Sequence, residues 1–203
     1  MLHRDRAALV VVDVQSRLLP TIHDSEQTLR QIVRAIRGFQ LLGAPVIVTE
    51  QYRRGLGATH PAIQEAVLTP PPHDGTLPTD LAPPRDAFAV SPGFEVLEKM
   101  TFSCAADPAF LDHIETRGKR QIVLVGIEAH VCVLQTALQL VEREFETYVL
   151  ADAVSSRSPR NVEIALSRMS QEGVKHASVE MAIFEMLHVC ATDEFKAWLK
   201  LIK

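Results

Sequence analysis

The sequence contains little cysteine, few aromatic residues and no long apolar run. Only 3 of its 203 residues are cysteine, and none lies in a CxxC spacing, so neither a disulfide framework nor a cysteine-based zinc site is indicated. No apolar stretch approaches the roughly 20 residues of a membrane span, and the amino terminus lacks the apolar segment of a secretory signal. We therefore expect a protein of the reducing cytoplasm that makes no contact with a membrane.

An excess of positive charge is also absent. Lys and Arg number 21 against 25 Asp and Glu, a formal net charge of −4, and this balance does not favour the broad basic face that binds nucleic acid. No GxGxxG or GxxxxGK[ST] pattern follows an apolar run, so dinucleotide and nucleoside triphosphate binding have no support. A small neutral or anionic molecule is the partner that fits the composition best.

Four short segments are apolar almost throughout, namely ALVVVDV at 8–14, PVIVTE at 45–50, QIVLVGI at 121–127 and TYVLAD at 147–152. Apolar runs without alternation are typical of strands that are buried on both faces, and such strands occur mostly in parallel sheets. Two weaker strands are expected at FEVLEK, 94–99, and near KHASV, 175–179. The pattern therefore predicts six strands.

Amphipathic helical patterns separate these apolar runs. The first begins at Asp24, which with Gln27 forms an expected capping pair, and ends at Gly43. Asp-Pro or Ser-Pro before a helix and glycine after it mark two more, at 107–118 and 158–173. Further helices are expected after Cys132 and around Trp198, near the carboxyl terminus, and the outer helices are expected to expose enough apolar surface for a homo-oligomer.

Strands that alternate with helices predict one doubly wound α/β domain over residues 1–203. Its parallel six-stranded sheet should have the order 3-2-1-4-5-6, with helices on both faces. The stretch 57–93 holds most of the 12 prolines and cannot be one regular element. We interpret its central part, about 69–93, as a long surface insert and a candidate lid over a site.

Three residues suited to catalysis follow strands that should meet at one edge of this sheet. Asp13 ends the first strand, Lys99 ends the third, and Cys132 follows the fourth. Ligands of open α/β sheets bind outside the carboxyl ends of the strands, near the point where the strand order reverses. Each residue alone also has an ordinary explanation, as a loop acceptor, a solvated charge and a core side chain respectively.

Together the three residues form a consistent catalytic group. A helix amino terminus and a nearby ammonium both favour the thiolate, so Cys132 would be an activated nucleophile. Asp13 would take the thiol proton and return it to a leaving amine, while Lys99 balances the charge. Backbone N–H groups between Glu128 and Cys132 would form an oxyanion hole.

The motifs that carry these residues are similar to the signatures of the isochorismatase-like cysteine hydrolases. They are VVVDVQ with Asp13, EKMTFSC with Lys99 and GIEAHVCV with Cys132, and TEQYRRGLGATHP at 49–61 resembles the branch of isochorismatase domain-containing proteins. The resemblance implies an Asp-Lys-Cys triad that hydrolyses an amide-type C–N bond through a thioester, without a cofactor. It also implies a cis peptide, by position Ile127–Glu128, that turns the Glu128 N–H towards the substrate carbonyl.

The chain departs from two branches of that superfamily. Nicotinamidases carry an Asp-x-His metal motif where this chain has Glu50, Gln51 and Tyr52, so a metal-bound nicotinamidase is not expected. Isochorismatases proper cleave a vinyl ether without a cysteine nucleophile, which disfavours that reaction here. The alternatives to the cysteine hydrolase are a metal-free nicotinamidase-type amidase and a non-enzymatic ligand-binding or interaction protein that retains the triad.

Several further residues receive lesser roles. Gln51 and Tyr52 leave the second strand beside Asp13 and are candidate substrate contacts. His130 precedes the nucleophile by two residues, and we expect it to orient the loop or line the pocket, because Asp13 already fills the position of the base. Asp152 is expected to be a structural hydrogen-bond acceptor. Cys104 and Cys190 are expected in the core or next to the site.

Overall fold

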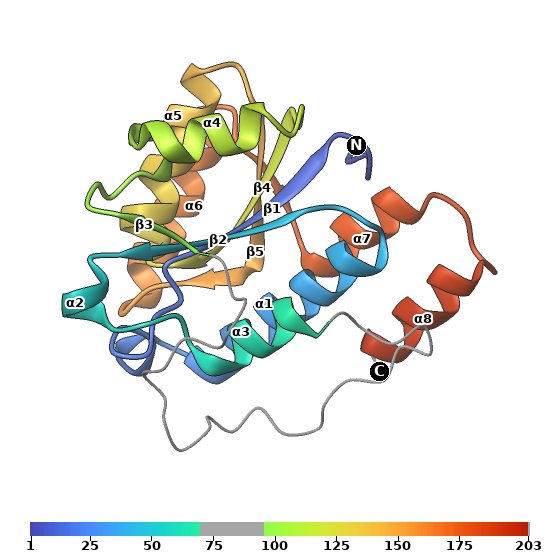
Figure 1. Ribbon diagram of the computed structural model, residues 1–203, viewed down its shortest axis with the longest axis horizontal. Coiled ribbons are helices and arrows are strands. Elements are labelled where there is room, and N and C mark those ends of the chain that lie inside the picture. The colour runs from blue at the N-terminus through green and yellow to red at the C-terminus, as the bar shows by residue number, and fades with distance from the viewer. Residues whose placement is uncertain (70–95, 203) are drawn as a thin grey trace.

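The computed structural model describes residues 1–69 and 96–202 and has the predicted sheet (Figure 1). Six parallel strands lie in the order β3-β2-β1-β4-β5-β6. They are β1 (Ala7–Val12), β2 (Val46–Gln51), β3 (Leu97–Lys99), β4 (Gln121–Ile127), β5 (Glu146–Ser155) and β6 (Lys175–Ala177). The reversal of strand order therefore falls between β1 and β4, where the sequence predicts the site.

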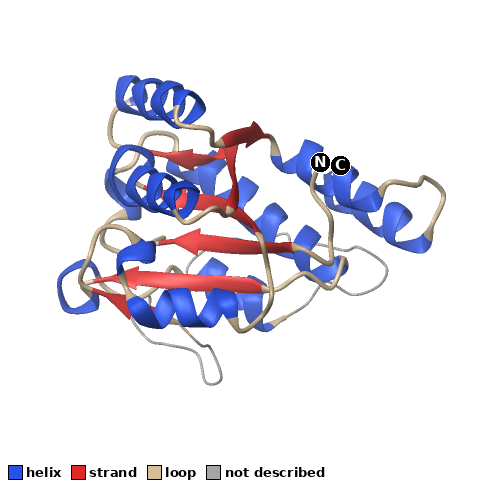
Figure 2. Ribbon diagram, turned by 90° about the horizontal axis from the view of Figure 1, so that it is seen from above, coloured by secondary structure: helices blue, strands red, loops and turns tan. Residues whose placement is uncertain are grey.

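Helices cover both faces of the sheet and form three layers (Figures 1 and 2). One face carries α4 (Pro108–Glu115), α5 (Leu134–Glu142) and α6 (Pro159–Gln171), and the other carries α1 (Ser25–Leu41), α3 (Pro61–Leu68), α7 (Val179–Leu187) and α8 (Asp193–Ile202). Strand β1 supplies both cores, since Leu9 and Val11 pack with α1 and Val10 and Val12 pack on the side of α5. Burial on both faces explains the uninterrupted apolar runs.

Short helical turns join these elements at the carboxyl edge of the sheet. They are η1 (Leu19–Thr21), α2 (Arg53–Leu56), η2 (Cys104–Ala106) and η3 (Ala129–Val133), of which η3 is a π-helical turn. Helix α5 continues directly from η3. The nucleophile candidate therefore lies in a π turn just before α5, and the sequence predicted it at or just before the first turn of that helix.

The structure corrects three details of the predicted elements. Helix α3 lies inside the stretch 57–93, because Pro61 occupies the first helical position, where its missing N–H costs nothing. Helix α7 directly follows β6 and was not predicted. Asp24 has a left-handed backbone (φ 49°) and makes no side-chain cap, so α1 begins at Ser25 without the expected capping pair. The proposed lid lies almost wholly outside the described residues.

A glycine brings β1 and β4 close together just before the site. Gly126 has φ 121°, and a Cβ built there would lie 2.1 Å from the carbonyl oxygen of Val12. Only glycine fits this close approach of two backbones. The pairing of β4 with β5 also shifts register between Leu124 and Gly126. The close contact sets Asp13 beside the turn that carries Cys132.

Candidate active site

A buried ion pair forms the centre of the site. The Asp13 carboxylate and the Lys99 ammonium are 2.7 Å apart (Oδ2 to Nζ), and their side chains are 0% and 2% exposed. Asp13 follows β1 with a left-handed backbone (φ 52°), which aspartate tolerates better than most residues. Charges are buried in this way only when they are paired and hydrogen-bonded.

Oxygen atoms surround the Lys99 ammonium. Besides Asp13, Nζ donates to Gln51 Oε1 at 2.9 Å and to the carbonyl oxygens of Thr101 and Phe102 at 3.2 and 3.0 Å. Burial disfavours the charged form, but the Asp13 carboxylate and then the thiols of Cys104 and Cys132 outweigh it and raise the pKa of Lys99. Lys99 is therefore a fixed cation and a poor proton donor at neutral pH.

The Cys132 thiol shares the Asp13 carboxylate with Lys99. Burial, and after it the charge of Asp13, raise the pKa of this thiol; the Lys99 ammonium acts in the opposite direction, and a hydrogen bond with Asp13 raises the pKa further. These effects favour the protonated thiol, whereas the sequence analysis expected a helix terminus and Lys99 to favour the thiolate. A nucleophilic attack from this state requires transfer of the thiol proton to Asp13.

The loop before Cys132 is held by the connection between β5 and α6. The peptide bond between Ile127 and Glu128 is cis, at the position that the family resemblance implies. The Glu128 carboxylate accepts two hydrogen bonds at Oε2, from the Arg157 backbone N–H at 3.0 Å and from Arg157 Nε at 3.1 Å. This ion pair connects the expected oxyanion loop to the segment just before α6.

His130 is bound on both sides of its ring. Nδ1 lies 2.9 Å from Ser156 Oγ, and Nε2 lies 3.3 Å from Asn161 Nδ2. Both partners belong to the β5–α6 region, so the ring joins this region to η3. The contacts agree with an orienting role and leave Asp13 as the candidate base for Cys132.

The two substrate contacts expected after β2 differ in the structure. Gln51 is buried, and its side chain is used at both ends, because Oε1 accepts from Lys99 and Nε2 donates to the Met100 carbonyl oxygen at 3.0 Å. Tyr52 is 46% exposed, and its ring lies over Gly55. Gln51 therefore holds Lys99, and Tyr52 alone remains available to a ligand.

The contacts and burial of Asp152, Cys104 and Cys190 test the roles that the sequence analysis predicted for them. Asp152 accepts from the Val179 backbone N–H at 2.9 Å and from Gln31 Nε2 at 3.3 Å, so it is the structural acceptor that was predicted. Cys104 is completely buried beside the site. Cys190 is exposed, so its expected place in the core or next to the site is wrong.

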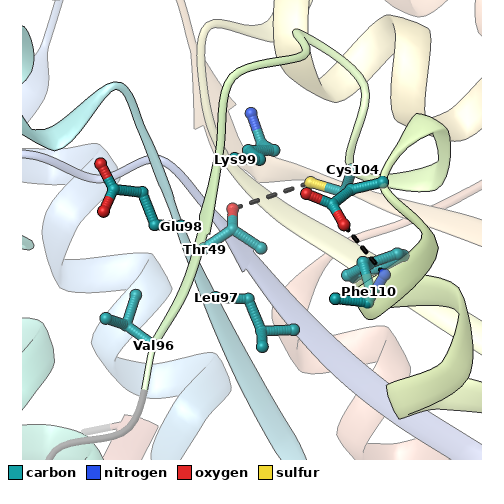
Figure 3. Close-up of a pocket in the computed structure, with 9 residues that line it drawn as sticks. Thr49, Val96, Leu97, Glu98, Lys99, Cys104 and Phe110 are labelled. Atoms are coloured by element: carbon teal, nitrogen blue, oxygen red, sulfur yellow. Dashed lines mark hydrogen bonds between the residues drawn. The ribbon is translucent and has the colours of Figure 1, made fainter.

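Thr49 and Cys104 were not predicted to act together, yet both lie next to Asp13. Thr49 Oγ1 donates to Asp13 Oδ1 at 2.8 Å, and Cys104 Sγ lies 3.7 Å from Thr49 Oγ1 (Figure 3). Both residues line a cavity of about 110 Å³, together with Val96, Leu97, Glu98, Lys99, Asp107, Ala109 and Phe110. Neither Asp13 nor Cys132 lines this cavity, so it is not where a substrate would meet the nucleophile.

Glu50 stands at the first position of the nicotinamidase metal motif, and its carboxylate folds the loop that follows β2. Oε1 accepts from the Thr59 backbone N–H at 2.6 Å and from Thr59 Oγ1 at 2.8 Å, while Oε2 lies 3.5 Å from Arg53 Nε. Within residues 1–69 and 96–202, no three His, Cys, Asp or Glu side chains are grouped so as to hold a metal ion. The same residues include no helix with the length and apolar character of a membrane span.

Comparison with known proteins identifies similar chains. The family model of the isochorismatase domain matches residues 7–181, a range that contains Asp13, Lys99 and Cys132. The secreted isochorismatase effector Isc1 of Phytophthora sojae is 34% identical over 205 residues, which cover 97% of this chain and 84% of that protein. Isochorismatase domain-containing protein 1 of Danio rerio is 32% identical over 191 residues, 94% of this chain and 59% of that protein.

A solved structure of similar sequence has the same fold. The MAR1 ribonuclease of Caenorhabditis elegans aligns with a TM-score of 0.80 and 30% identity, over 99% of this chain and 91% of its own.

Proposed function

Since this chain belongs to the isochorismatase family of hydrolases, we propose that it hydrolyses a small amide-type (C–N) or related carbonyl compound through a thioester on Cys132. The observation that carries the proposal is the shared carboxylate. Asp13 and Lys99 are buried and paired at 2.7 Å, and the charge of Asp13 and a hydrogen bond with it raise the pKa of the Cys132 thiol. A nucleophile, a base and a fixed cation in contact are the groups that acyl transfer requires.

In the first half of the reaction, Cys132 Sγ attacks the substrate carbonyl carbon while its proton passes to Asp13. The backbone N–H groups of Glu128 and Cys132 would stabilise the negative charge that develops on the carbonyl oxygen. When the tetrahedral intermediate collapses, the C–N bond breaks and Asp13 returns the proton to the leaving amine. The products of this half are the free amine and the acyl thioester.

In the second half, water replaces the amine. Asp13 takes one proton from the water while the water oxygen attacks the thioester carbon. The C–S bond then breaks and releases a carboxylic acid. The proton on Asp13 returns to Cys132 Sγ, which restores the resting thiol. Lys99 keeps its proton throughout and balances the charge of the carboxylate. The scheme uses only the side chains and backbone of this chain.

A panel of small primary amides with detection of ammonia tests the proposal. We expect release of ammonia by the unaltered protein and none by Cys132→Ala, and the intact mass of the quenched protein should increase by one acyl group. Full activity in Cys132→Ala would contradict the mechanism. Nicotinamide belongs in the panel with and without a chelator, since turnover that resists the chelator would assign the metal-free nicotinamidase-type activity.

Labelling of the thiols separates an enzyme from a binding protein that retains the triad. The exposed Cys190 provides the rate of an ordinary thiol within the same chain. In an enzyme, labelling of Cys132 should depend on Asp13 and Lys99. Labelling that is indifferent to Asp13→Asn and Lys99→Met would favour the binding protein. RNA is a further substrate to include, because one similar protein is named a ribonuclease; we expect no cleavage that depends on Cys132.

We also propose that the chain forms a homo-oligomer. Ile164 on α6 and Met181 on α7 expose 52% and 53% of their surface on the outer helices, one on each face of the sheet. Contact with another copy of the chain would be favourable at either position, because it removes apolar surface from water. Light scattering should give a mass that is a multiple of 22.5 kDa. A mass of one chain at working concentration would contradict the proposal.

A further inference from the structure

The hydroxyl group of Thr49 lies between the proposed base and a second buried thiol. Thr49 belongs to β2, and its side chain is buried. Its Oγ1 is 2.8 Å from Asp13 Oδ1 on one side. On the other side it is 3.7 Å from Cys104 Sγ, the contact drawn in Figure 3. The reaction described above assigns no step to Thr49 or Cys104, although Thr49 contacts its proposed base directly.

The direction of both hydrogen bonds is fixed by chemistry. An ionised carboxylate has no proton to give, so the single proton of the Thr49 hydroxyl points to Asp13. The hydroxyl oxygen must then accept the S–H of Cys104. Burial, and after it the charge of Asp13, raise the pKa of Cys104 to about 11, so this thiol keeps its proton at neutral pH. The two hydrogen bonds therefore run in one direction, from Cys104 to Thr49 and from Thr49 to Asp13.

Cys104 is in turn fixed to the helix that carries the nucleophile. Its backbone N–H donates to Thr136 Oγ1 at 2.9 Å, and Thr136 lies four residues after Cys132, about one helical turn further on. Cys104 and Thr136 are both completely buried. The contacts link the position of the Asp13 carboxylate to that of the nucleophile through Thr49, Cys104 and Thr136.

We propose that Thr49 is a positioning residue for the general base, which fixes the plane of the Asp13 carboxylate and keeps it ready to accept the Cys132 proton. Cys104 supplies the hydrogen bond that orients Thr49. Lys99 holds only Oδ2, and without a donor at Oδ1 the carboxylate is free to turn about that contact. A lost hydrogen bond to the ionised form also makes a carboxylate easier to protonate. The inference rests on the proposed function, because it assumes that Asp13 acts as the base.

The test compares one variant that lacks the hydroxyl group of Thr49 with one that retains it. Thr49→Val keeps the branched shape and removes the donor, whereas Thr49→Ser keeps the donor. The measurement is the rate at which iodoacetamide alkylates Cys132 in the full chain, from about pH 3 to pH 9, resolved by mass spectrometry of the peptides. Exposed Cys190 reports in each sample how the reagent treats an ordinary thiol.

The expected result is a shift on the acid side of the profile. The acid side reports the group that takes the thiol proton, and its midpoint should be about one pH unit higher in Thr49→Val than in the unaltered protein, the effect of one hydrogen bond to a charged group. It should stay at the original value in Thr49→Ser. Cys104→Ala should shift the midpoint in the same direction by less, and Cys104→Ser should not; these variants leave β2 intact and maintain the test if Thr49→Val does not fold.

Each of the other outcomes overturns the inference. Equal midpoints in Thr49→Val and the unaltered protein would show that the hydroxyl does not act on Asp13. Equal shifts in Thr49→Val and Thr49→Ser would show a packing effect. If Asp13→Asn leaves the profile of the unaltered protein unchanged, then Asp13 is not the base, and the proposed function fails together with this inference.

Discussion

The two halves of the site are built in different ways. In the half that holds the proposed base, Asp13, which follows β1, bonds to Thr49 of β2 and Lys99 of β3, and the Lys99–Asp13 pair is 2% and 0% exposed. In the half that holds the nucleophile, backbone geometry places Cys132, and the supporting Arg157–Glu128 pair is 63% and 8% exposed. One half is closed to water and the other reaches the surface.

This difference separates stability from chemistry. A buried pair that loses one partner leaves an uncompensated charge in the interior, so a substitution in the base half should affect both folding and catalysis. A surface pair contributes little to folding because water and salt screen it. A substitution in the nucleophile half should therefore alter reactivity while the free energy of unfolding changes little. The following predictions test that separation, from the largest effect to the smallest.

Asp13→Asn should have the largest effect. Asparagine tolerates the left-handed backbone, so the variant removes the charge without adding strain. Loss of a general base slows a reaction by about 10² to 10⁴-fold, and the unpaired Lys99 should lower the free energy of unfolding by about 3–5 kcal/mol. Alkylation of Cys132 and urea denaturation measure the two effects. If Asp13→Asn lowers the free energy of unfolding but leaves the rate of Cys132 alkylation unchanged, the Asp13–Lys99 pair has only a structural role.

Lys99→Met should destabilise the fold by a similar amount and slow alkylation less. Asp13 would remain as a buried charge, at a cost of about 3–5 kcal/mol. The thiol would also lose the cation that opposes the rise in its pKa, so alkylation at neutral pH should become slower. The double variant Asp13→Asn/Lys99→Met should be more stable than either single variant in urea, because no buried charge is left. If the decrease in the free energy of unfolding in the double variant equals the sum of the two single decreases, the two charges are not coupled.

Arg157→Ala tests the nucleophile half. The free energy of unfolding should fall by less than about 1 kcal/mol, since the guanidinium is largely exposed. Alkylation of Cys132 should slow several-fold, because Glu128 loses the partner that holds its loop. Arg160→Ala is the matched control, since its pair with Glu163 lies on the neighbouring helix and is exposed on both sides. If Cys132 is alkylated at the same rate in Arg157→Ala and Arg160→Ala, then Arg157 does not hold the loop.

The strand order and the place of the site could be predicted because both depend on local patterns. Buried strands leave uninterrupted apolar runs, and a parallel sheet brings every carboxyl end to one edge. Asp13 and Lys99 were therefore expected together although 86 residues separate them, and the structure pairs them. The apolar runs indicate which strands are buried and at which edge of the sheet each strand ends. This information was enough to predict that Asp13 and Lys99 lie close together.

The partners within the site could not be predicted in the same way. Thr49 is a β-branched residue in an apolar strand, which is typical of any strand, and its bond to Asp13 crosses 36 residues. The π turn at Cys132 has the same apolar spacing as an α-helix, so the sequence predicted Cys132 at or just before the first turn of a helix and no π turn. Helix α3 was hidden by the many prolines that follow it, although Pro61 is placed where a helix begins.

The smallest effect is expected at the opposite edge of the sheet, where Glu146 begins β5. Burial opposes its ionised form, but hydrogen bonds from Lys175, Gln121 and Tyr148 outweigh it and lower the pKa of Glu146 to about 2. A lowered pKa stabilises the fold above the ordinary value for glutamate, and this stabilisation is lost as the pH falls towards about 2.

Glu146→Gln should therefore be less stable than the unaltered protein at neutral pH, by less than about 1 kcal/mol because the pair is partly exposed. The difference should shrink as the pH falls from about 4.5 towards 2, since the protonated glutamic acid resembles glutamine. Urea denaturation at several pH values measures this change, and a difference that does not vary with pH would contradict it. Alkylation of Cys132 should be unaffected, because no contact joins this edge to the described part of the site; a slower rate would mean that stability and chemistry are coupled across the whole sheet.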